Sequence, residues 1–174
     1  MATATDWAWL AGLFDGEGCI TINRQYASRR ADLKTDSFRL YVQITMGCRK
    51  TLERCREITG VGSIQKHTPT KKKSNPAFCW MTNGREAAGV LKRIRCHLIT
   101  KLAEADEAML FAAIGPWLTG GRHGNTPKPQ ELVDRMINHY WRIRMLKPRW
   151  RFYAKKLKRV EKAEIKRLAI SINQ

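Results

Sequence analysis

Two short segments in which apolar and polar residues alternate constrain the fold of this chain more than any other feature. In Phe38–Ile44 every second residue is apolar, and in Cys19–Gln25 the residues Ile20 and Ile22 alternate with polar neighbours. A period of two is typical of a strand with one buried and one solvated face. The connecting stretch Tyr26–Ser37 is polar and basic, so the two strands are predicted to pair as a hairpin around a loop.

A second hairpin is predicted from the strands Ser63–His67 and Ala77–Thr82, which are joined by the basic loop Thr68–Pro76. Two hairpins, each followed by a helix, predict an α+β fold with one mostly antiparallel sheet and helices on one face. The other face of such a sheet can remain wet, and in this sequence it is polar and basic. That face is therefore predicted to be free to meet a ligand.

Helices account for much of the remaining chain. They are predicted at Asp6–Asp15, Lys50–Thr59, Asn83–Arg95, Leu98–Ile114, Gln130–Leu146 and Arg149–Ile172. Asp6 is the predicted N-cap of the first helix, and Asn83 is that of the third. Gly16 and Gly18 are predicted to break the first helix before the first strand.

Composition divides the chain into three parts. Residues 1–114 hold the predicted sheet with its helices, and residues 115–129 form a Gly- and Pro-rich linker. Residues 130–174 form a basic helical extension, which carries twelve Lys and Arg but only two Glu from Arg142 onward. Its aromatic residues are predicted to pack back on the core: Trp141, Trp150, Phe152 and Tyr153.

The net charge of the chain indicates the chemistry of its partner. There are 33 Lys and Arg against 15 Asp and Glu, which gives a net charge of +18. A charge of this size favours a polyanion, and nucleic acid is the first candidate. An acidic membrane surface is the second candidate, but no long amphipathic anchor stands at either terminus.

The cysteines and the N-terminus bear on the compartment. The five cysteines are Cys19, Cys48, Cys55, Cys79 and Cys96. Their odd number and the absence of CxxC spacing argue against a disulfide framework and a zinc site. The N-terminus resembles neither a signal peptide nor a transit peptide, and no apolar stretch is long enough for a membrane span. We therefore expect an intracellular protein in the cytoplasm, the nucleoid or an organelle interior, and not a secreted one.

The first predicted helix ends in a segment with candidate catalytic residues. It runs Trp9-Leu10-Ala11-Gly12-Leu13-Phe14-Asp15-Gly16-Glu17-Gly18. Ala8, Ala11 and Gly12 are small enough to let two helix backbones approach, so two chains could form a dimer across this helix. The crossing would bring two Glu17 carboxylates together at helix C-termini, which is stable only with cations or protons and so suits divalent metals. The alternative is that Glu17 is a solvated acid in a tight turn.

This segment closely resembles the LAGLIDADG motif of homing endonucleases, with an acidic residue at both acidic positions. The resemblance extends over residues 6–114 and does not reach the C-terminal helices. It implies the αββαββα homing-endonuclease fold, with an antiparallel sheet shaped as a saddle. A single motif per chain implies a homodimer that binds a long pseudo-palindromic double-stranded DNA site. The family hydrolyses one phosphodiester bond on each strand with divalent metals, here Mg²⁺, although Mn²⁺ or Ca²⁺ could occupy the same sites.

The resemblance also implies roles for individual residues. Glu17 and the carbonyl of Gly16 would be metal ligands, and Asp15 would support the helix end. Gln43 and Lys101 would surround the catalytic metals, although Lys101 could equally be a surface lysine of a helix. Arg49 or Lys50 would fill a similar basic role, and Met46 stands where a polar residue is expected. The histidines show no metal-ligand spacing: His67, His97, His123 and His139.

DNA is predicted to bind the polar face of the sheet. The side chains expected in its three rows are Thr21, Asn23 and Gln25, then Arg39, Tyr41 and Gln43, then Ser63, Gln65 and His67. Amide and Arg side chains suit base edges in the major groove. The basic loop residues are expected to contact phosphates: Arg29, Arg30, Lys71, Lys72 and Lys73. The fourth strand leaves its DNA-facing register open, since both of its faces are apolar, and a merely solvated sheet face is the alternative for the amides.

Two other functions remain open from the sequence. A maturase of the same family would bind intron RNA and assist splicing, with weak or no DNA cleavage. A basic transcription regulator of the same fold is the third possibility. An acidic residue at position 17 favours cleavage, because a regulator has no need of it.

Overall fold

The computed structural model describes residues 2–29, 34–67, 77–115, 127–148, 155 and 159–172. Four strands form one sheet: β1 (Gly18–Gln25), β2 (Ser37–Met46), β3 (Ser63–His67) and β4 (Ala77–Asn83). The strand order is β1-β2-β4-β3, and each neighbouring pair is antiparallel. The two predicted hairpins are therefore joined in the middle of the sheet by β2 and β4.

Six helices and two short 3₁₀ turns accompany the sheet in the described ranges. They are α1 (Ala4–Glu17), α2 (Arg49–Thr59), α3 (Gly84–Ile94), α4 (Leu102–Ala113), α5 (Gln130–Met145) and α7 (Arg159–Ile172), with η1 (Ala27–Arg29) and η2 (Arg95–His97). Within residues 2–114 the order αββαββα is followed by α4, which confirms the predicted α+β fold. No helix in the described ranges is long and apolar enough to cross a membrane.

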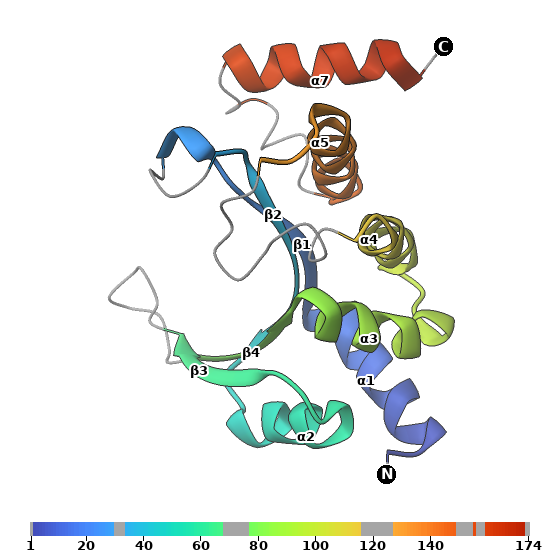
Figure 1. The fold of residues 1–174 in the computed structure, drawn as a ribbon. Coiled ribbons are helices and arrows are strands. Elements are labelled where there is room, and N and C mark those ends of the chain that lie inside the picture. The colour runs from blue at the N-terminus through green and yellow to red at the C-terminus, as the bar shows by residue number, and fades with distance from the viewer. Residues whose placement is uncertain are drawn as a thin grey trace.

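The helices cover one face of the curved sheet, as Figure 1 shows, and the described residues place no helix on the other face. The core lies between the two layers. Its largest fully buried side chains include Phe14, Leu40, Trp80, Phe111 and Trp141. Trp141 belongs to α5, so this helix of the extension shares one core with the sheet.

The first helix begins earlier and ends later than the sequence predicted. Thr3, not Asp6, is the N-cap, because the Thr3 hydroxyl accepts a hydrogen bond from the Asp6 N–H. The Asp6 carboxylate bonds back to the Thr3 N–H at 2.9 Å, which completes a capping box. Gly16 stays inside the helix, which ends at Glu17. Gly18 makes the change to strand possible, because a Cβ there would lie 2.5 Å from the Phe14 carbonyl oxygen.

Other predicted features differ from the structure or lie beyond the described residues. The helix predicted from Leu98 begins at Leu102, because the backbone before it is tied to Asp15. Asn83 occupies the N-cap position of α3, but its side chain makes no capping hydrogen bond. The linker residues 116–126 and the loop residues 68–76 lie outside the described residues, as do Trp150, Phe152 and Tyr153.

Candidate functional site

Glu17 is the last residue of α1 and stands exposed where the helix gives way to β1. Among the described residues no side chain forms an ion pair or hydrogen bond with its carboxylate, and the last turn of α1 contains no basic residue. A carboxylate at a helix C-terminus is repelled by the carbonyl end of the helix dipole. A cation near Glu17 would therefore offset the negative potential at the end of α1.

Asp15 takes a different part, because its carboxylate is fully engaged within the chain. It accepts hydrogen bonds from the Ile99 N–H at 2.7 Å, the Thr100 hydroxyl at 2.9 Å and the Lys101 N–H at 3.0 Å. Partial burial alone would raise the pKa of Asp15, but these hydrogen bonds outweigh it and hold the pKa below its usual value. Asp15 thus ties the end of α1 to the turn before α4, which fits the supporting role that the motif implied.

Lys101 lies at the N-cap of α4, directly beside the end of α1. Its ammonium donates a hydrogen bond to the Asp15 carbonyl oxygen. A cation at this position offsets the negative end of the α1 dipole without pairing with Glu17. The structure therefore brings Lys101 and Glu17 to the same corner, and Lys101 is not a lysine on an outer helix face.

Gln43 enters the same region from the sheet. The β1–β2 register places Gln43 opposite Cys19, two residues beyond Glu17, and its side chain is half-buried on the face away from the helices. Arg49 and Lys50 open α2, but Arg49 pairs with Glu53 at 2.9 Å. Met46 shares the helix-covered side of the sheet by its register with Phe78.

Lys147 is a residue near this corner that sequence reasoning missed. Its ammonium donates to the Ile20 carbonyl at 2.7 Å and to the buried Glu104 carboxylate at 2.8 Å, and it lies 3.7 Å from the Cys19 sulfur. It therefore anchors the end of the α5 segment to the first residues of β1. Nothing in the sequence pattern signals this contact, since 127 residues separate Lys147 from Ile20.

The polar face of the sheet has the composition that the alternation predicted. The register places Thr21 opposite Tyr41 and Asn23 opposite Arg39. These four side chains are exposed or half-exposed, while Ile20, Ile22, Leu40 and Val42 on the other face are fully buried. Ser63 and Gln65 are exposed in the third row. Arg29 is exposed in η1, whereas Arg30, Lys71, Lys72, Lys73 and the side chain of His67 lie outside the described residues.

Strand pairing resolves the face of β4 that the sequence left open. Met81 lies between Gln43 and Ser63, and Cys79 lies opposite Gln65. Both therefore belong to the polar face, whereas Trp80 points into the core and is fully buried. The face thus has an apolar centre flanked by amides and hydroxyls, and Asn83 extends it opposite Tyr41.

One chain supplies few ligands for a metal. No cluster of three or more His, Cys, Asp or Glu side chains that could hold an ion occurs in the part of the chain that the structure describes. The exposed Glu17 carboxylate and the backbone carbonyls at the end of α1 are hard oxygen donors of the kind that Mg²⁺ and Ca²⁺ bind. These oxygen donors fit a divalent cation.

The exposed side of α1 contains small residues that a second chain could approach. Ala8 and Gly12 are exposed, and a Cβ added at Gly12 would meet nothing within 4 Å. Trp9 beside them is 42% exposed. Ala11, which was predicted to share this surface, is fully buried in its own chain. Because α1 is apolar around most of its circumference, the sequence did not reveal which side of the helix would face the core.

Comparisons with known proteins identify relatives of the whole arrangement. The sequence profile of the family described as LAGLIDADG endonuclease matches residues 10–103. Among solved structures, the homing endonuclease I-CvuI in complex with its target is similar with a TM-score of 0.65 and 15% identity, over 95% of this chain and 96% of that one. No curated protein sequence matches the chain.

Two further solved structures share the fold. The archaeal intron-encoded homing endonuclease I-Vdi141I, complexed with DNA, matches with a TM-score of 0.63 and 14% identity, over 82% of this chain and 84% of that one. The group I intron-encoded homing endonuclease I-CeuI, also complexed with DNA, gives a TM-score of 0.63 and 15% identity, over 85% of this chain and 69% of that one.

Proposed function

The chain belongs to the LAGLIDADG endonuclease family, and from this premise we propose that it is a homing endonuclease that cuts double-stranded DNA at a specific site. It would bind a long pseudo-palindromic site as a homodimer and hydrolyse one phosphodiester bond on each strand. The observation that carries the proposal is Glu17, an exposed carboxylate without a described partner, placed beside a polar sheet face in a chain of net charge +18.

Divalent metals are part of the proposal. Glu17 and the Gly16 carbonyl would hold them, with Mg²⁺ as the physiological ion. Bound there, such ions would polarise the scissile phosphoryl oxygen and lower the pKa of the attacking water. The I-CvuI structures were obtained in the presence of calcium in one case and magnesium in another, which supports this choice of ion class.

The number of carboxylates supports a homodimer. Each chain has one such motif, and only Glu17 of its site acids is left without a partner in the described ranges. Two chains that cross at Ala8 and Gly12 would bring their Glu17 side chains near each other, since both small residues are exposed and Gly12 lies only five residues before Glu17. The same contact would cover the exposed ring of Trp9.

Lys101 and Gln43, which lie near Glu17, would stabilise charge and orient water. The Lys101 ammonium is held at the end of α1 by the Asp15 carbonyl, where its field would stabilise negative charge that develops on the phosphate. The Gln43 amide on the sheet face could orient the attacking water by hydrogen bonding. Asp15 has no open acceptor role in this scheme, since three donors occupy its carboxylate.

Sequence recognition would take place on the polar face. Asn23 and Gln25 suit adenine and Arg39 suits guanine in the major groove, which admits a two-stranded β-ribbon. The basic loops would contact phosphates and make the affinity strongly dependent on salt. DNA is a better candidate than intron RNA, because the similar solved structures I-Vdi141I and I-CeuI are both complexes with DNA.

The test is a selection of cleaved sites from a randomised double-stranded DNA library. With Mg²⁺ present, the purified chain should enrich one near-palindromic site whose two cleavage positions are related by the twofold symmetry. Omission of the metal should abolish enrichment. A parallel assay with group I intron RNA should show no stimulation of splicing. Enrichment of no DNA sequence, together with stimulated splicing, would replace the endonuclease proposal by the maturase.

A further inference from the structure

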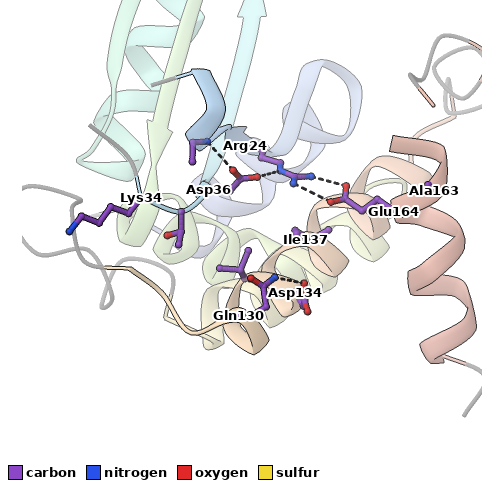
Figure 2. A pocket seen from close by; sticks show the side chains of 11 residues that line it. Arg24, Lys34, Asp36, Gln130, Asp134, Ile137, Ala163 and Glu164 are labelled. Atoms are coloured by element: carbon purple, nitrogen blue, oxygen red, sulfur yellow. Dashed lines mark hydrogen bonds and ion pairs between the residues drawn. The ribbon is translucent and has the colours of Figure 1, made fainter. Parts of the chain in front are cut away.

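The end of the β1–β2 hairpin farthest from Glu17 is held by a partly buried charge network, part of which Figure 2 shows. Arg24 lies at its centre, with only 9% of its side chain exposed. Its Nε donates to Asp36 at 2.6 Å, and its two terminal nitrogens donate to the Glu164 carboxylate at 2.7 and 3.1 Å. The Trp141 Nε1 donates to the same carboxylate at 2.7 Å. We call Arg24, Asp36, Trp141 and Glu164 the α7 latch.

The latch joins four parts of the chain that are far apart in sequence. Arg24 is the second-last residue of β1, Asp36 belongs to the loop before β2, Trp141 lies in α5 and Glu164 lies in α7. Asp36 also accepts a hydrogen bond from the Ala27 N–H at 2.9 Å, which ties down the start of the loop. A guanidinium this buried needs both carboxylates, because an unpaired charge in the interior is costly.

Polar contacts add to aromatic packing at this end of the hairpin, where the Phe38 and Tyr140 rings lie 6.1 Å apart. A groove of about 550 Å³ lies beside the latch, between the loop and α5, and is lined by residues that include Val133, Ile137 and Asp134. Figure 2 shows the latch bonds crossing from the hairpin to α7 next to this groove. The hairpin end is therefore fixed to the helical layer by directional polar contacts as well as by aromatic packing.

The latch lies next to the residues that would read DNA at the outer end of the sheet. Asn23 and Gln25 flank Arg24 in β1, and their side chains point to the opposite face because strand residues alternate. Arg39 lies opposite Asn23 and borders the same hollow of about 170 Å³ on that face. Fixing the direction of Arg24 therefore fixes the direction of both of its neighbours.

We propose that the α7 latch orients the outer end of the hairpin for DNA reading, which makes Glu164 a positioning residue for selectivity at the outer base pairs of each half-site. The proposal rests on the proposed function. β1 has eight residues, so seven steps of about 3.3 Å place Gln25 roughly 23 Å from Gly18. That length equals about seven base pairs of B-DNA, so the latch acts far from the cleaved bond.

The experiment compares two variants that lose the same charge. Glu164→Gln keeps the shape of the side chain but removes the carboxylate that Arg24 needs. Glu57→Gln removes an exposed carboxylate from α2, at the opposite end of the molecule in Figure 1, where it forms a surface pair with Arg54 at 3.2 Å. Dissociation constants of the full chain are measured for the selected site and for every single-base substitution, made symmetrically in both half-sites.

We expect Glu164→Gln to lose discrimination at the outer positions only. A mismatch that weakens wild-type binding about tenfold should weaken binding by the variant about threefold or less, while inner positions keep their wild-type ratios. Glu57→Gln should match the wild type at all positions. Trp141→Phe, which removes one hydrogen bond to Glu164 but keeps a ring, should show the same outer pattern to a smaller degree.

Three other outcomes would contradict these expectations. An equal loss at inner and outer positions would mean that Glu164 acts on stability or overall charge and not on the hairpin. If both latch variants discriminate at the outer positions as the wild type does, and the wild type binds its site selectively, the proposed role of the latch is refuted and the proposed function stands. A wild-type chain that selects no DNA site would refute the proposed function, and the latch proposal would fall with it.

Discussion

Replacement of Asp15 by Asn tests the tie between the end of α1 and the turn before α4. The carboxylate accepts three hydrogen bonds of 2.7 to 3.0 Å, and an amide oxygen cannot replace its charge or both of its oxygens. A hydrogen bond to a charged group contributes about 1.5–3 kcal/mol when shielded from water. Because Asp15 is partly exposed, we discount the sum to a loss of about 2 kcal/mol in the free energy of unfolding.

The loss should depend on pH with a defined sign. The pKa of Asp15 in the folded chain lies below 3.8, so the ionised form is favoured by folding. Its stabilisation is complete at pH values well above 3.8 and is lost as the pH falls through the lower folded value. The difference between the wild type and Asp15→Asn should therefore be full at pH 7 and should shrink steadily below pH 3.8.

Thermal unfolding followed by circular dichroism measures both effects. For a chain of this size, 2 kcal/mol corresponds to a fall in Tm of about 4–8 °C at pH 7. Asp106→Asn is the matched control, since Asp106 forms an exposed ion pair with Arg95 and its replacement should lower Tm far less than Asp15→Asn. Equal Tm values for Asp15→Asn and the wild type, or a difference that persists undiminished at acid pH, would refute this reasoning.

Two further substitutions probe the dimer and the centre of the sheet face. Gly12→Leu should give a monomer in sedimentation velocity, because the new side chain fills the surface where two helices would cross; Gly89→Leu, at another exposed helical glycine with open space around it, should still dimerise. Met81 should contact a thymine methyl group of the selected site. Replacing that thymine by uracil should therefore weaken wild-type binding about fourfold, which corresponds to about 0.8 kcal/mol for one buried methyl group. The same replacement should not change DNA binding by Met81→Ser. A site whose thymines can all be replaced by uracil without loss would contradict that contact.

The strands were predictable because their signal is local. Ile20 and Ile22 on β1, and Phe38 through Ile44 on β2, alternate strictly, and one buried face of a sheet requires that period. The start of α1 was also readable, because Thr3 and Asp6 have capping-box spacing, although the sequence reading placed the cap three residues too late. Local patterns therefore carried most of the fold.

The features that escaped prediction depend on contacts between distant segments. The delayed start of α4 results from Asp15, which lies 84 residues before Ile99. The inward face of Ala11 and the outward face of Met81 depend on which elements pack or pair beside them. The latch joins Arg24 to Glu164 across 140 residues, and no periodicity in either segment announces an ion pair.

We propose that Glu17 binds the metals of cleavage and does not bind DNA. Single-turnover cleavage of the selected site by Glu17→Gln, with the bound fraction of DNA measured in the same samples, tests it most directly. We predict a fall in cleavage rate of at least about a thousandfold, as expected when several kcal/mol of charge stabilisation is lost, with a Kd within about threefold of the wild type. Cleavage near the wild-type rate, or a loss of binding in parallel with cleavage, would contradict the claim.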